Sequence, residues 1–313
     1  MADPPTPETI LAQREAIDPV FLDSPLVHHP ALDEALGLSC TIKVETLNPL
    51  RSFKGRGTEA VIAALPPTSG VTTSSSGNFG QGIAWAAGRR GIAATIVSSS
   101  AANPLKVAAM RRLGAEVVQT DADEEGRKAI ARSMAAEKGF VFIEDGTHPE
   151  IAAGNGTIAQ EMTDAGLRPD VVVIQVGDGS LAVGVGAWIK ARSPDTRMVA
   201  VVPSGSPSMQ RSLEAGRPVE VPSNTIADGM ATERPVPAAV DLLPRCVDEV
   251  VGVDDEQILA AMRLLVDAAG LIAEPSGAAG VAALMADRQF AGLEVAAVVT
   301  GSNIDPALYV RLW

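Results

Sequence analysis

Short apolar runs rich in Val and Ile alternate along the chain with longer alanine-rich segments that end at or near a glycine. Apolar runs without polar alternation are typical of parallel strands that are buried on both faces, and glycine commonly ends a helix. We therefore expect strands over residues 41–45, 93–99, 116–120, 140–144, 170–177, 197–203 and 295–301. The clearest helices are expected over residues 78–91, 103–115, 123–139 and 255–270.

This alternation of strand and helix predicts an α/β fold of open, mostly parallel sheets covered by helices. Residues 69–147 hold a strand–helix set of their own, which we interpret as a small domain inserted into a larger one. The larger domain would consist of residues 1–68 and 148–313, with a cleft between the two domains. A chain of 313 residues is long enough to build both cores.

Composition narrows the classes of function. The formal net charge of -13 disfavours nucleic acids and anionic membranes as partners. No apolar run is long enough to suggest a membrane span, and the opening MADPPTPETI has neither the basic start nor the apolar stretch of a signal peptide. We expect a cytoplasmic protein whose partner is a small molecule.

Metal and thiol chemistry have little support in the sequence. Cys40 and Cys246 are the only cysteines and lie far apart, which favours two reduced thiols over a disulfide. The three histidines, His28, His29 and His148, form no cluster with the spacing of metal ligands. We therefore expect neither a metal site nor a Ser-His-Asp triad.

The stretch NPLRSFKGRG, residues 48–57, places a lysine in a turn flanked by glycines. Burial beside an apolar group such as Phe53 favours an unprotonated amine, which a nucleophile needs. Lys43 and Lys106 have ordinary settings by comparison. Lys54 is thus the candidate for a covalent bond to a carbonyl, and the alternative is a structural or surface lysine.

Two loops rich in Gly and Ser each follow an expected strand and precede an expected helix. SSSGNFGQG, residues 74–82, offers successive backbone N–H groups to an anion such as a carboxylate; the alternative is a plain helix cap. VGDGSLAVGVG, residues 176–186, predicts a phosphate cradle without the lysine of a Walker A loop or the G-x-G-x-x-G spacing. It favours a phosphate monoester over a nucleotide. Asp178 should point away or meet a cation, because its charge repels a phosphate.

Taken in order, these stretches resemble the fold-type-II pyridoxal-5′-phosphate enzymes of the tryptophan synthase β-like superfamily, in particular the threonine/serine dehydratase and serine racemase branch. The resemblance covers nearly the whole chain. It rests on the motifs FLDSPLV, SFKGRG, SSGNFGQG, NPLKVAAMRRLGAEVV, AAGNGTIAQEM, VGDGSL, TIADG, EPSGAAGVAAL and VTGSN. It implies the cofactor pyridoxal 5′-phosphate in the cleft between the domains, and a homodimer or homotetramer.

The resemblance also implies roles for individual residues. Lys54 would form a Schiff base with the cofactor, Asn78 would lie beside its 3′-oxygen and Thr300 would contact its pyridine nitrogen. Ser76 is a second candidate catalytic residue: its counterpart in racemases donates a proton, whereas here it either does so or binds the substrate carboxylate. The implied cofactor-binding residues are Phe53, Lys54, Asn78, Gly177, Asp178, Gly179, Ser180, Leu181 and Thr300. The implied substrate-binding residues are Ser75, Ser76, Gly77, Asn78 and Phe79.

The chain departs from the family pattern at three of these positions. Asp178 and Ser180 replace glycines of the phosphate loop, which bears on the geometry of phosphate binding. Phe79 stands where dehydratases commonly have histidine, which bears on the shape of the substrate pocket.

Three charged residues near the motifs have two interpretations each. Arg51 and Arg56 either offset the charge of cofactor or substrate, or form surface ion pairs. Glu274 either approaches the cofactor or only begins the helix that follows it.

The resemblance implies an ammonia-lyase that converts a β-hydroxy L-amino acid, such as threonine or serine, to a 2-oxo acid and ammonia. The alternatives are a racemase, a β-substitution enzyme similar to cysteine synthase, an enzyme similar to threonine synthase, and a non-catalytic protein that binds the cofactor or an amino acid. TIADG and GNGTIAQEM favour the dehydratase branch. The joint presence of Lys54, Asn78 and Thr300 favours catalysis over binding alone.

Overall fold

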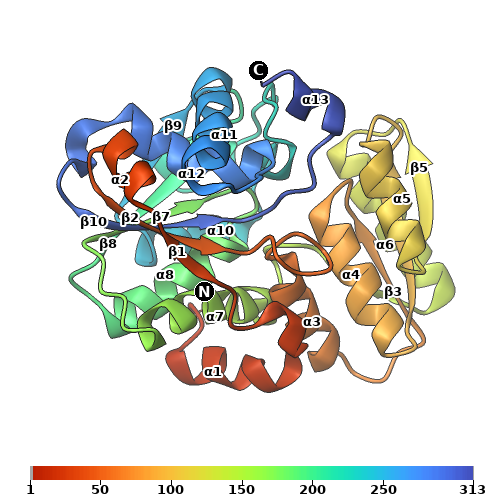
Figure 1. Ribbon diagram of the computed structural model, residues 1–313. Coiled ribbons are helices and arrows are strands. Elements are labelled where there is room, and N and C mark those ends of the chain that lie inside the picture. Colours follow the sequence, from red (N-terminus) through yellow and green to blue (C-terminus); the bar gives the residue numbers. More distant parts are fainter. Residues whose placement is uncertain (1–2, 313) are drawn as a thin grey trace.

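Two β-sheets with helices packed against them make up the protein, as a computed structural model that describes residues 3–312 shows (Figure 1). The six-stranded sheet has the order β1-β2-β10-β7-β8-β9, and the four-stranded sheet has the order β5-β4-β3-β6. The strands of the larger sheet are β1 (Leu26–His28), β2 (Ser39–Val44), β7 (Val171–Gln175), β8 (Arg197–Pro203), β9 (Glu249–Val253) and β10 (Glu294–Val299). Those of the smaller sheet are β3 (Gly70–Ser74), β4 (Ala93–Ser99), β5 (Glu116–Thr120) and β6 (Val141–Phe142).

Neighbouring strands run parallel in both sheets, except that β1 pairs with β2 in the antiparallel direction. The predicted fold class, an α/β protein with two mostly parallel sheets, is therefore confirmed. The smaller sheet is built from residues 70–142. The exact domain boundaries at 68/69 and 147/148 remain predictions.

Three of the predicted strands match the structure residue for residue. The runs 93–99, 116–120 and 197–203 form β4, β5 and β8 over those residues. The run 140–144 forms only the two-residue β6, because the chain turns at Glu144, whose carbonyl accepts hydrogen bonds from the amide and hydroxyl of Thr147. The predicted strand ranges omit the edge strands β1 and β9, which are only partly buried, and the inner strand β3, whose buried residues include Thr72 and Thr73.

Helices pack against both faces of the larger sheet and against the smaller sheet. Those before β7 are α1 (Pro7–Ala16), α2 (Pro30–Leu36), α3 (Lys54–Ala64), α4 (Asn78–Arg89), α5 (Pro104–Arg112), α6 (Glu124–Lys138) and α7 (Pro149–Asp164). Those after β7 are α8 (Ser180–Arg192), α9 (Ser208–Ala215), α10 (Pro237–Leu242), α11 (Asp255–Ala269), α12 (Pro275–Ala286) and α13 (Pro306–Val310). The four predicted helices correspond to α4, α5, α6 and α11. Gly139 and Gly270 end α6 and α11 in the left-handed conformation, with φ of 66° and 64°.

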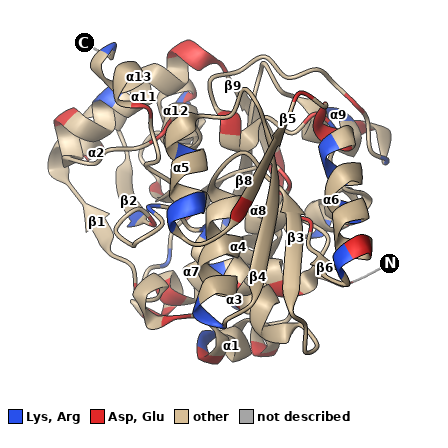
Figure 2. Cartoon of the chain, turned by 90° about the vertical axis from the view of Figure 1, so that its right-hand side faces the viewer, with Lys and Arg blue, Asp and Glu red and all other residues tan. Residues whose placement is uncertain are grey.

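The burial of both faces of the larger sheet explains why its strands are continuous apolar runs in the sequence. Val171 and Val173 of β7 face one apolar cluster, whereas Val172 and Ile174 face a second cluster on the opposite side of the sheet. Successive strand residues point to opposite faces, so both sets must be apolar when both faces are covered. A third cluster supports the smaller sheet, whose strands β3 and β4 carry no charged residue (Figure 2).

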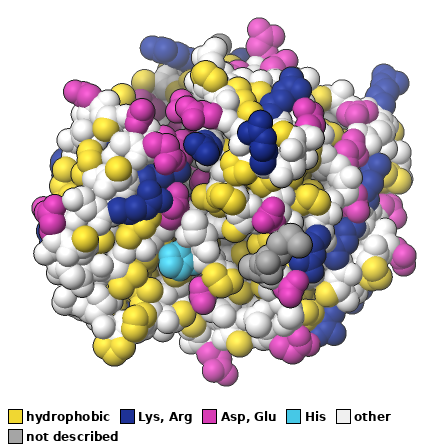
Figure 3. Space-filling model, turned by 180° about the vertical axis from the view of Figure 1, so that it is seen from behind, with side chains coloured by type: hydrophobic (Ala, Val, Ile, Leu, Met, Phe, Trp, Pro, Cys, Tyr) yellow, Lys and Arg dark blue, Asp and Glu magenta, His cyan; other side chains and the backbone are white. Residues whose placement is uncertain are grey.

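The surface carries charges of both signs, and both cysteines are buried. Asp and Glu are spread among Lys and Arg on the face seen in Figure 3. Across residues 3–312, none of the helices has both the length and the apolar character needed to cross a bilayer. Cys40 and Cys246 are free and buried, and burial raises the pKa of the Cys40 thiol to about 12. A thiol with such a pKa is unreactive near neutral pH.

Candidate active site

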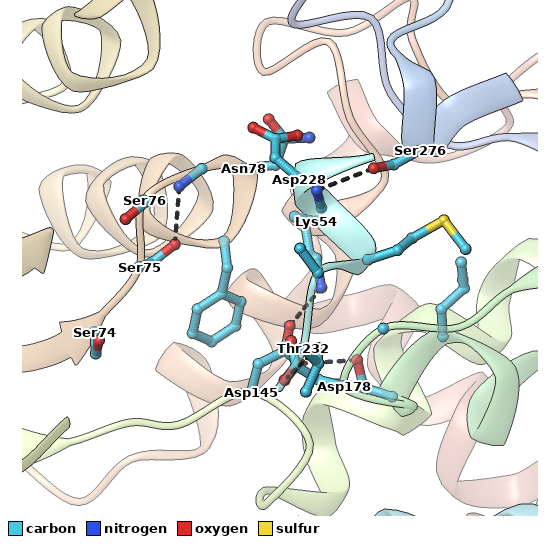
Figure 4. Close-up of a pocket in the computed structure, with 18 of the residues that line it drawn as sticks. Lys54, Ser74, Ser75, Ser76, Asn78, Asp145, Asp178, Asp228, Thr232 and Ser276 are labelled. Atoms are coloured by element: carbon cyan, nitrogen blue, oxygen red, sulfur yellow. Dashed lines mark hydrogen bonds and ion pairs between the residues drawn. The ribbon is translucent and has the colours of Figure 1, made fainter. Parts of the chain in front are cut away.

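A pocket lies between the two sheets, at the carboxyl ends of their strands. Its wall is formed by the loops that follow β3, β7 and β10 and by the first residues of α3. Ligands of parallel α/β sheets bind at this end of the strands. The pocket brings together every site residue expected from the sequence, namely Phe53, Lys54, Ser75, Ser76, Gly77, Asn78, Phe79, Gly177, Asp178, Gly179, Ser180, Leu181 and Thr300. Figure 4 shows Lys54 between Ser75, Ser76 and Asn78 on one side and Asp178 on the other.

Lys54 enters this pocket from the first turn of α3. The turn before it is held by Asn48, whose Oδ1 accepts hydrogen bonds from the backbone amides of Leu50 and Ser52. The side chain of Lys54 is 14 % exposed, and its Nζ lies 4.7 Å from the centroid of the Phe53 ring. The same Nζ forms an ion pair with the carboxylate of Asp145. The amine is thus partly buried, fixed and accessible from the pocket.

The loop between β7 and α8 has the form of an anion cradle. The backbone N–H groups of Asp178, Gly179, Ser180 and Leu181 have no acceptor among the residues that the structure describes. A Cβ at Gly177 would lie 2.9 Å from the carbonyl oxygen of Gly229, so a side chain there would force the loop away from its neighbour. Free N–H groups at the start of a thirteen-residue helix form a site for a phosphate.

Asp178 lies in the cradle, and its environment weakens the expected repulsion. Its Oδ1 accepts a 3.4 Å hydrogen bond from the hydroxyl of Thr232. Burial, followed by the nearby charge of Asp145, raises the pKa of Asp178 to about 7. The sequence predicted that this side chain would point away or meet a cation, whereas in the structure it stays in the pocket with a pKa that allows a neutral carboxyl.

The loop between β3 and α4 presents hydroxyl and amide groups on the opposite side of the pocket. Ser75 Oγ accepts hydrogen bonds from the amides of Gly77 and Gly80, which fixes the turn. Ser76 Oγ accepts from the amide of Ser99 at 3.1 Å and from the hydroxyl of Ser98 at 3.3 Å. Because Ser76 uses its oxygen as an acceptor in both contacts, its own proton is free to be donated into the pocket.

A polar network crosses the pocket beside Asn78. Its Nδ2 donates a 2.5 Å hydrogen bond to Glu274, and its Oδ1 accepts a 2.9 Å bond from Asn303. Lys106 forms ion pairs with Asp228 at 2.7 Å and Glu274 at 3.2 Å. The sequence-based view of Lys106 as an ordinary lysine is therefore wrong, since it is buried and lines the pocket. Glu274 both precedes α12 and lines the pocket, so its position is compatible with either interpretation.

Arg56 serves neither of its two expected roles. It is fully buried away from the pocket, and it contacts Glu45 at 2.8 Å and Glu161 at 2.6 Å. Lys43 is also buried and forms an ion pair with Glu161 at 2.6 Å. Although burial raises the pKa of Glu161, its hydrogen bonds and charge interactions with Arg56 and Lys43 lower that pKa to about 2. Arg56 is thus a structural residue that holds α3 against its neighbours.

The side chains of the pocket fit pyridoxal phosphate. Lys54 would supply the amine that binds its aldehyde, the N–H groups of the cradle would bind its phosphate, and the Thr300 hydroxyl would contact its ring nitrogen. The aldehyde, phosphate and ring nitrogen therefore each have a chemically suitable partner in one pocket. Across residues 3–312, no group of three His, Cys, Asp or Glu is arranged to hold a metal ion.

Several residues of the pocket were not identified from the sequence, among them Lys106, Asp145, Asp228 and Thr232. Asp228 belongs to the TIADG motif, so the resemblance contained a signal for it. Asp145 and Thr232 lie in irregular loops, and no local pattern in those loops indicates that they face Lys54 and Asp178.

Comparisons with known proteins agree with this geometry. Residues 17–301 match the family described as pyridoxal-phosphate dependent enzyme. The chain is 35 % identical over 312 residues to an L-threonine ammonia-lyase of Thermotoga maritima, covering 98 % of this chain and 78 % of that protein. It is 34 % identical to an L-threo-3-hydroxyaspartate ammonia-lyase of Pseudomonas sp, covering 92 % of each. It spans 56 % of the biosynthetic L-threonine dehydratase of Salmonella typhimurium.

Solved structures share the whole fold. A threonine deaminase of T.th. superposes with a TM-score of 0.90 and 34 % identity, covering 96 % of this chain and 99 % of that one. Maize serine racemase superposes with a TM-score of 0.91 and 29 % identity, covering 98 % of both chains. The predicted family, fold and cofactor are thereby confirmed, and the names of the relatives agree with the predicted ammonia-lyase class. The chain belongs to the family of pyridoxal-phosphate-dependent enzymes.

Proposed function

We propose that this protein is an ammonia-lyase that converts a β-hydroxy L-amino acid, of the threonine and serine class, to a 2-oxo acid and ammonia. One observation carries the proposal: the amine of Lys54 lies in a single pocket between the β7–α8 loop, with its free N–H groups, and the β3–α4 loop, with its hydroxyl and amide groups. The names of the relatives, which include threonine and hydroxyaspartate ammonia-lyases, support the same class of substrate.

In this proposal, each group of residues in the pocket has its own role in the reaction. Pyridoxal phosphate, when bound, supplies an aldehyde that captures the substrate amine and a ring that stabilises negative charge at the α-carbon. Lys54 holds the cofactor and, once displaced by the substrate amine, removes the proton from the α-carbon as a general base. The loop of Ser75, Ser76 and Asn78 orients the substrate carboxylate, and the amides of the cradle hold the phosphate.

Racemisation is a second candidate activity of the same site. It is favoured by the hydroxyl of Ser76, whose proton is free to be donated because its oxygen accepts from Ser98 and Ser99. Reprotonation of the α-carbon from the side of Ser76 would invert the substrate, whereas loss of the β-hydroxyl gives the 2-oxo acid.

A panel of amino acids tests the proposal directly. Purified protein loaded with pyridoxal phosphate should be yellow, and mass analysis after borohydride reduction should locate the cofactor on Lys54. We expect 2-oxo acid and ammonia in equal amounts from one or more of L-threonine, L-serine and L-threo-3-hydroxyaspartate. Chiral analysis of the remaining substrate measures racemisation. A loaded protein that releases no 2-oxo acid from any hydroxy amino acid would contradict the lyase proposal and favour substitution or binding.

We further propose that the protein works in the cytoplasm as a homodimer or homotetramer, as the resemblance implies. Light scattering of the purified protein measures its assembly size.

A further inference from the structure

Asp145 is an acidic residue in direct contact with the amine of Lys54. One carboxylate oxygen forms the ion pair with Lys54 Nζ, and the other accepts a 2.8 Å hydrogen bond from the hydroxyl of Ser180 in the phosphate cradle. Its side chain is only 8 % exposed, and it faces the pocket (Figure 4). The carboxylate therefore lies between the candidate base and the expected place of the phosphate.

The backbone holds Asp145 firmly in this position. The next residue, Gly146, has a φ of 80°, and a Cβ there would lie 2.9 Å from the carbonyl oxygen of Asp178. The loop between β6 and α7 thus packs directly against the cradle. Glycine at position 146 therefore allows the loop that carries Asp145 to lie close to the cradle.

The charge of Asp145 also acts on a second carboxyl group of the pocket, that of Asp178. Burial and the charge of Asp145 raise the pKa of Asp178 to about 7. The other charged groups that act on Asp178 are Lys54, Glu124 and Lys128. When two buried carboxyl groups interact, one of them keeps its proton at a pH where an isolated carboxyl would be ionised.

Loss of a hydroxyl group from carbon needs a proton, because hydroxide is a poor leaving group. Lys54 gains a proton when it removes the one on the α-carbon. Asp145 is the carboxylate in contact with that amine. We propose, on the basis of the function proposed above, that Asp145 is a catalytic acid that delivers this proton to the departing β-hydroxyl.

The proton transfer needs no reactant other than the substrate, Lys54 and Asp145. The bond between the α-carbon and its hydrogen breaks, and the proton binds to Lys54. It then passes to the carboxylate of Asp145 and from there to the β-oxygen as the carbon–oxygen bond breaks. The electron pair left at the α-carbon forms the new carbon–carbon double bond, and the pair of the carbon–oxygen bond leaves with water. Lys54 enters this sequence as the neutral amine released when the substrate amine displaces it, and Asp145 enters as a carboxylate. Both return to these states at its end.

The test compares two leaving groups on the same carbon skeleton in the variant Asp145→Asn. L-Serine loses hydroxide and needs an acid, whereas β-chloro-L-alanine loses chloride and needs none. We expect kcat of the variant to fall about a hundredfold or more with L-serine and to stay within about threefold of wild type with β-chloro-L-alanine. An equal fall with both substrates, or no fall with either, would overturn the assignment.

A readout that is independent of turnover checks that the site of the variant is intact. Apoprotein of Asp145→Asn is incubated with pyridoxal phosphate, reduced with borohydride and digested, and the labelled fraction of Lys54 is measured by mass. We expect the same fraction as in wild type. A variant that takes up no label would show that Asp145 acts by placing the amine, which overturns its role as an acid.

Glu144→Gln is the matched control, because it removes the neighbouring carboxylate, which pairs with Lys128 and Arg132 instead of Lys54. Glu144→Gln should keep the wild-type ratio of kcat with L-serine to kcat with β-chloro-L-alanine. A change of this ratio as large as that of Asp145→Asn would contradict a specific role of Asp145.

Wild-type protein that consumes neither substrate would refute both the lyase proposal and the acid role of Asp145. Normal wild-type turnover with an unchanged ratio in Asp145→Asn would refute the acid role alone.

Discussion

Three basic side chains that lie in or near the motifs have different surroundings in the folded protein. The amine of Lys54 faces the pocket and contacts Asp145. Lys106 is held between two carboxylates that come from the other side of the pocket. Arg56 has no exposed surface, and its guanidinium contacts buried carboxylates. Position in the fold, and not residue type, therefore separates the candidate nucleophile from the structural cations.

The raised pKa of Asp178 predicts that the folded protein loses stability as the pH rises toward 7. This carboxyl has an ordinary pKa of 3.8 but a pKa of about 7 in the folded protein. Between these values the folded state binds one proton more than the unfolded state, so the free energy of unfolding falls as the pH rises. The slope from this one group is at most about 1.4 kcal/mol per pH unit.

Asparagine cannot ionise, so the variant Asp178→Asn should not show this loss of stability as the pH rises. Relative to wild type, the variant apoprotein should gain stability progressively between about pH 4 and pH 7, and the gain should stay constant above that range. Urea unfolding of both apoproteins over this pH range measures the difference, in which the other titrating groups largely cancel. A difference that does not change with pH would show that Asp178 titrates normally.

At the residue scale, the sequence predicted the pocket where chemistry is concentrated in short motifs. Lys54, the Ser75–Phe79 loop and the Gly177–Leu181 loop each sit at a junction of strand and helix, whose position follows from the parallel fold. Asp145 and Lys106 could not be predicted in the same way. Their roles depend on contacts with residues far away in the chain, and such contacts follow only from the packing of loops.

At the element scale, a buried ionic network fixes α3 and therefore the place of Lys54. Arg56, two residues after Lys54, donates hydrogen bonds to Glu45 just after β2 and to Glu161 of α7. Thr157 of α7 accepts another hydrogen bond from the same guanidinium. The first turn of α3 is thus attached to a strand and to a second helix at once.

Arg56→Ala should be strongly destabilising. Removal of the guanidinium leaves Glu45 and Glu161 as buried charges without their main partner, which typically costs about 3–5 kcal/mol. Arg56→Lys should cost less, because it keeps the charge but loses the forked hydrogen bonds. Denaturant unfolding measures both, and the labelled fraction of Lys54 after borohydride reduction should fall in Arg56→Ala.

Arg211→Ala is the control for this prediction. Arg211 forms an exposed ion pair with Glu214, at 3.0 Å, on one helix. Its loss should change the free energy of unfolding by less than about 0.5 kcal/mol. A similar cost for Arg56→Ala and Arg211→Ala would refute the structural role of the buried network.

The elements themselves were predictable to the extent that burial leaves a pattern. Fully buried strands such as β7 and β8 are continuous apolar runs, and glycines in the left-handed conformation mark the ends of α6 and α11. Edge strands leave a weaker pattern. The strand β1 has only three residues, none of them fully buried, and β9 mixes buried, partly buried and exposed positions. Neither run differs enough from a loop to be identified by its apolar pattern.

At the scale of the whole molecule, polar contacts join the two sheets across the pocket. Lys106 and Asn78, from the helices of the smaller sheet, contact Glu274 at the start of α12. On another side, the carboxylate of Glu124 accepts a 3.2 Å hydrogen bond from the backbone amide of Glu233. The position of the smaller sheet relative to the larger one therefore depends on charged groups that line the pocket.

Lys106→Met should loosen the smaller sheet relative to the larger one. The change removes the ion pairs with Asp228 and Glu274 while it keeps much of the apolar stem of the side chain. Burial already raises the pKa of Glu274, and the charge of Lys106 opposes that effect, so the variant should bind a proton at Glu274 more readily. We expect faster hydrogen exchange in β3 and β4, unchanged exchange in β7 and β8, and a higher KM with a smaller change in kcat.

The amides of the larger sheet serve as the internal control, because the loss of a contact that holds the smaller sheet in place should leave their exchange unchanged. Equal acceleration in both sheets would mean that Lys106 contributes to global stability and does not hold the two sheets together.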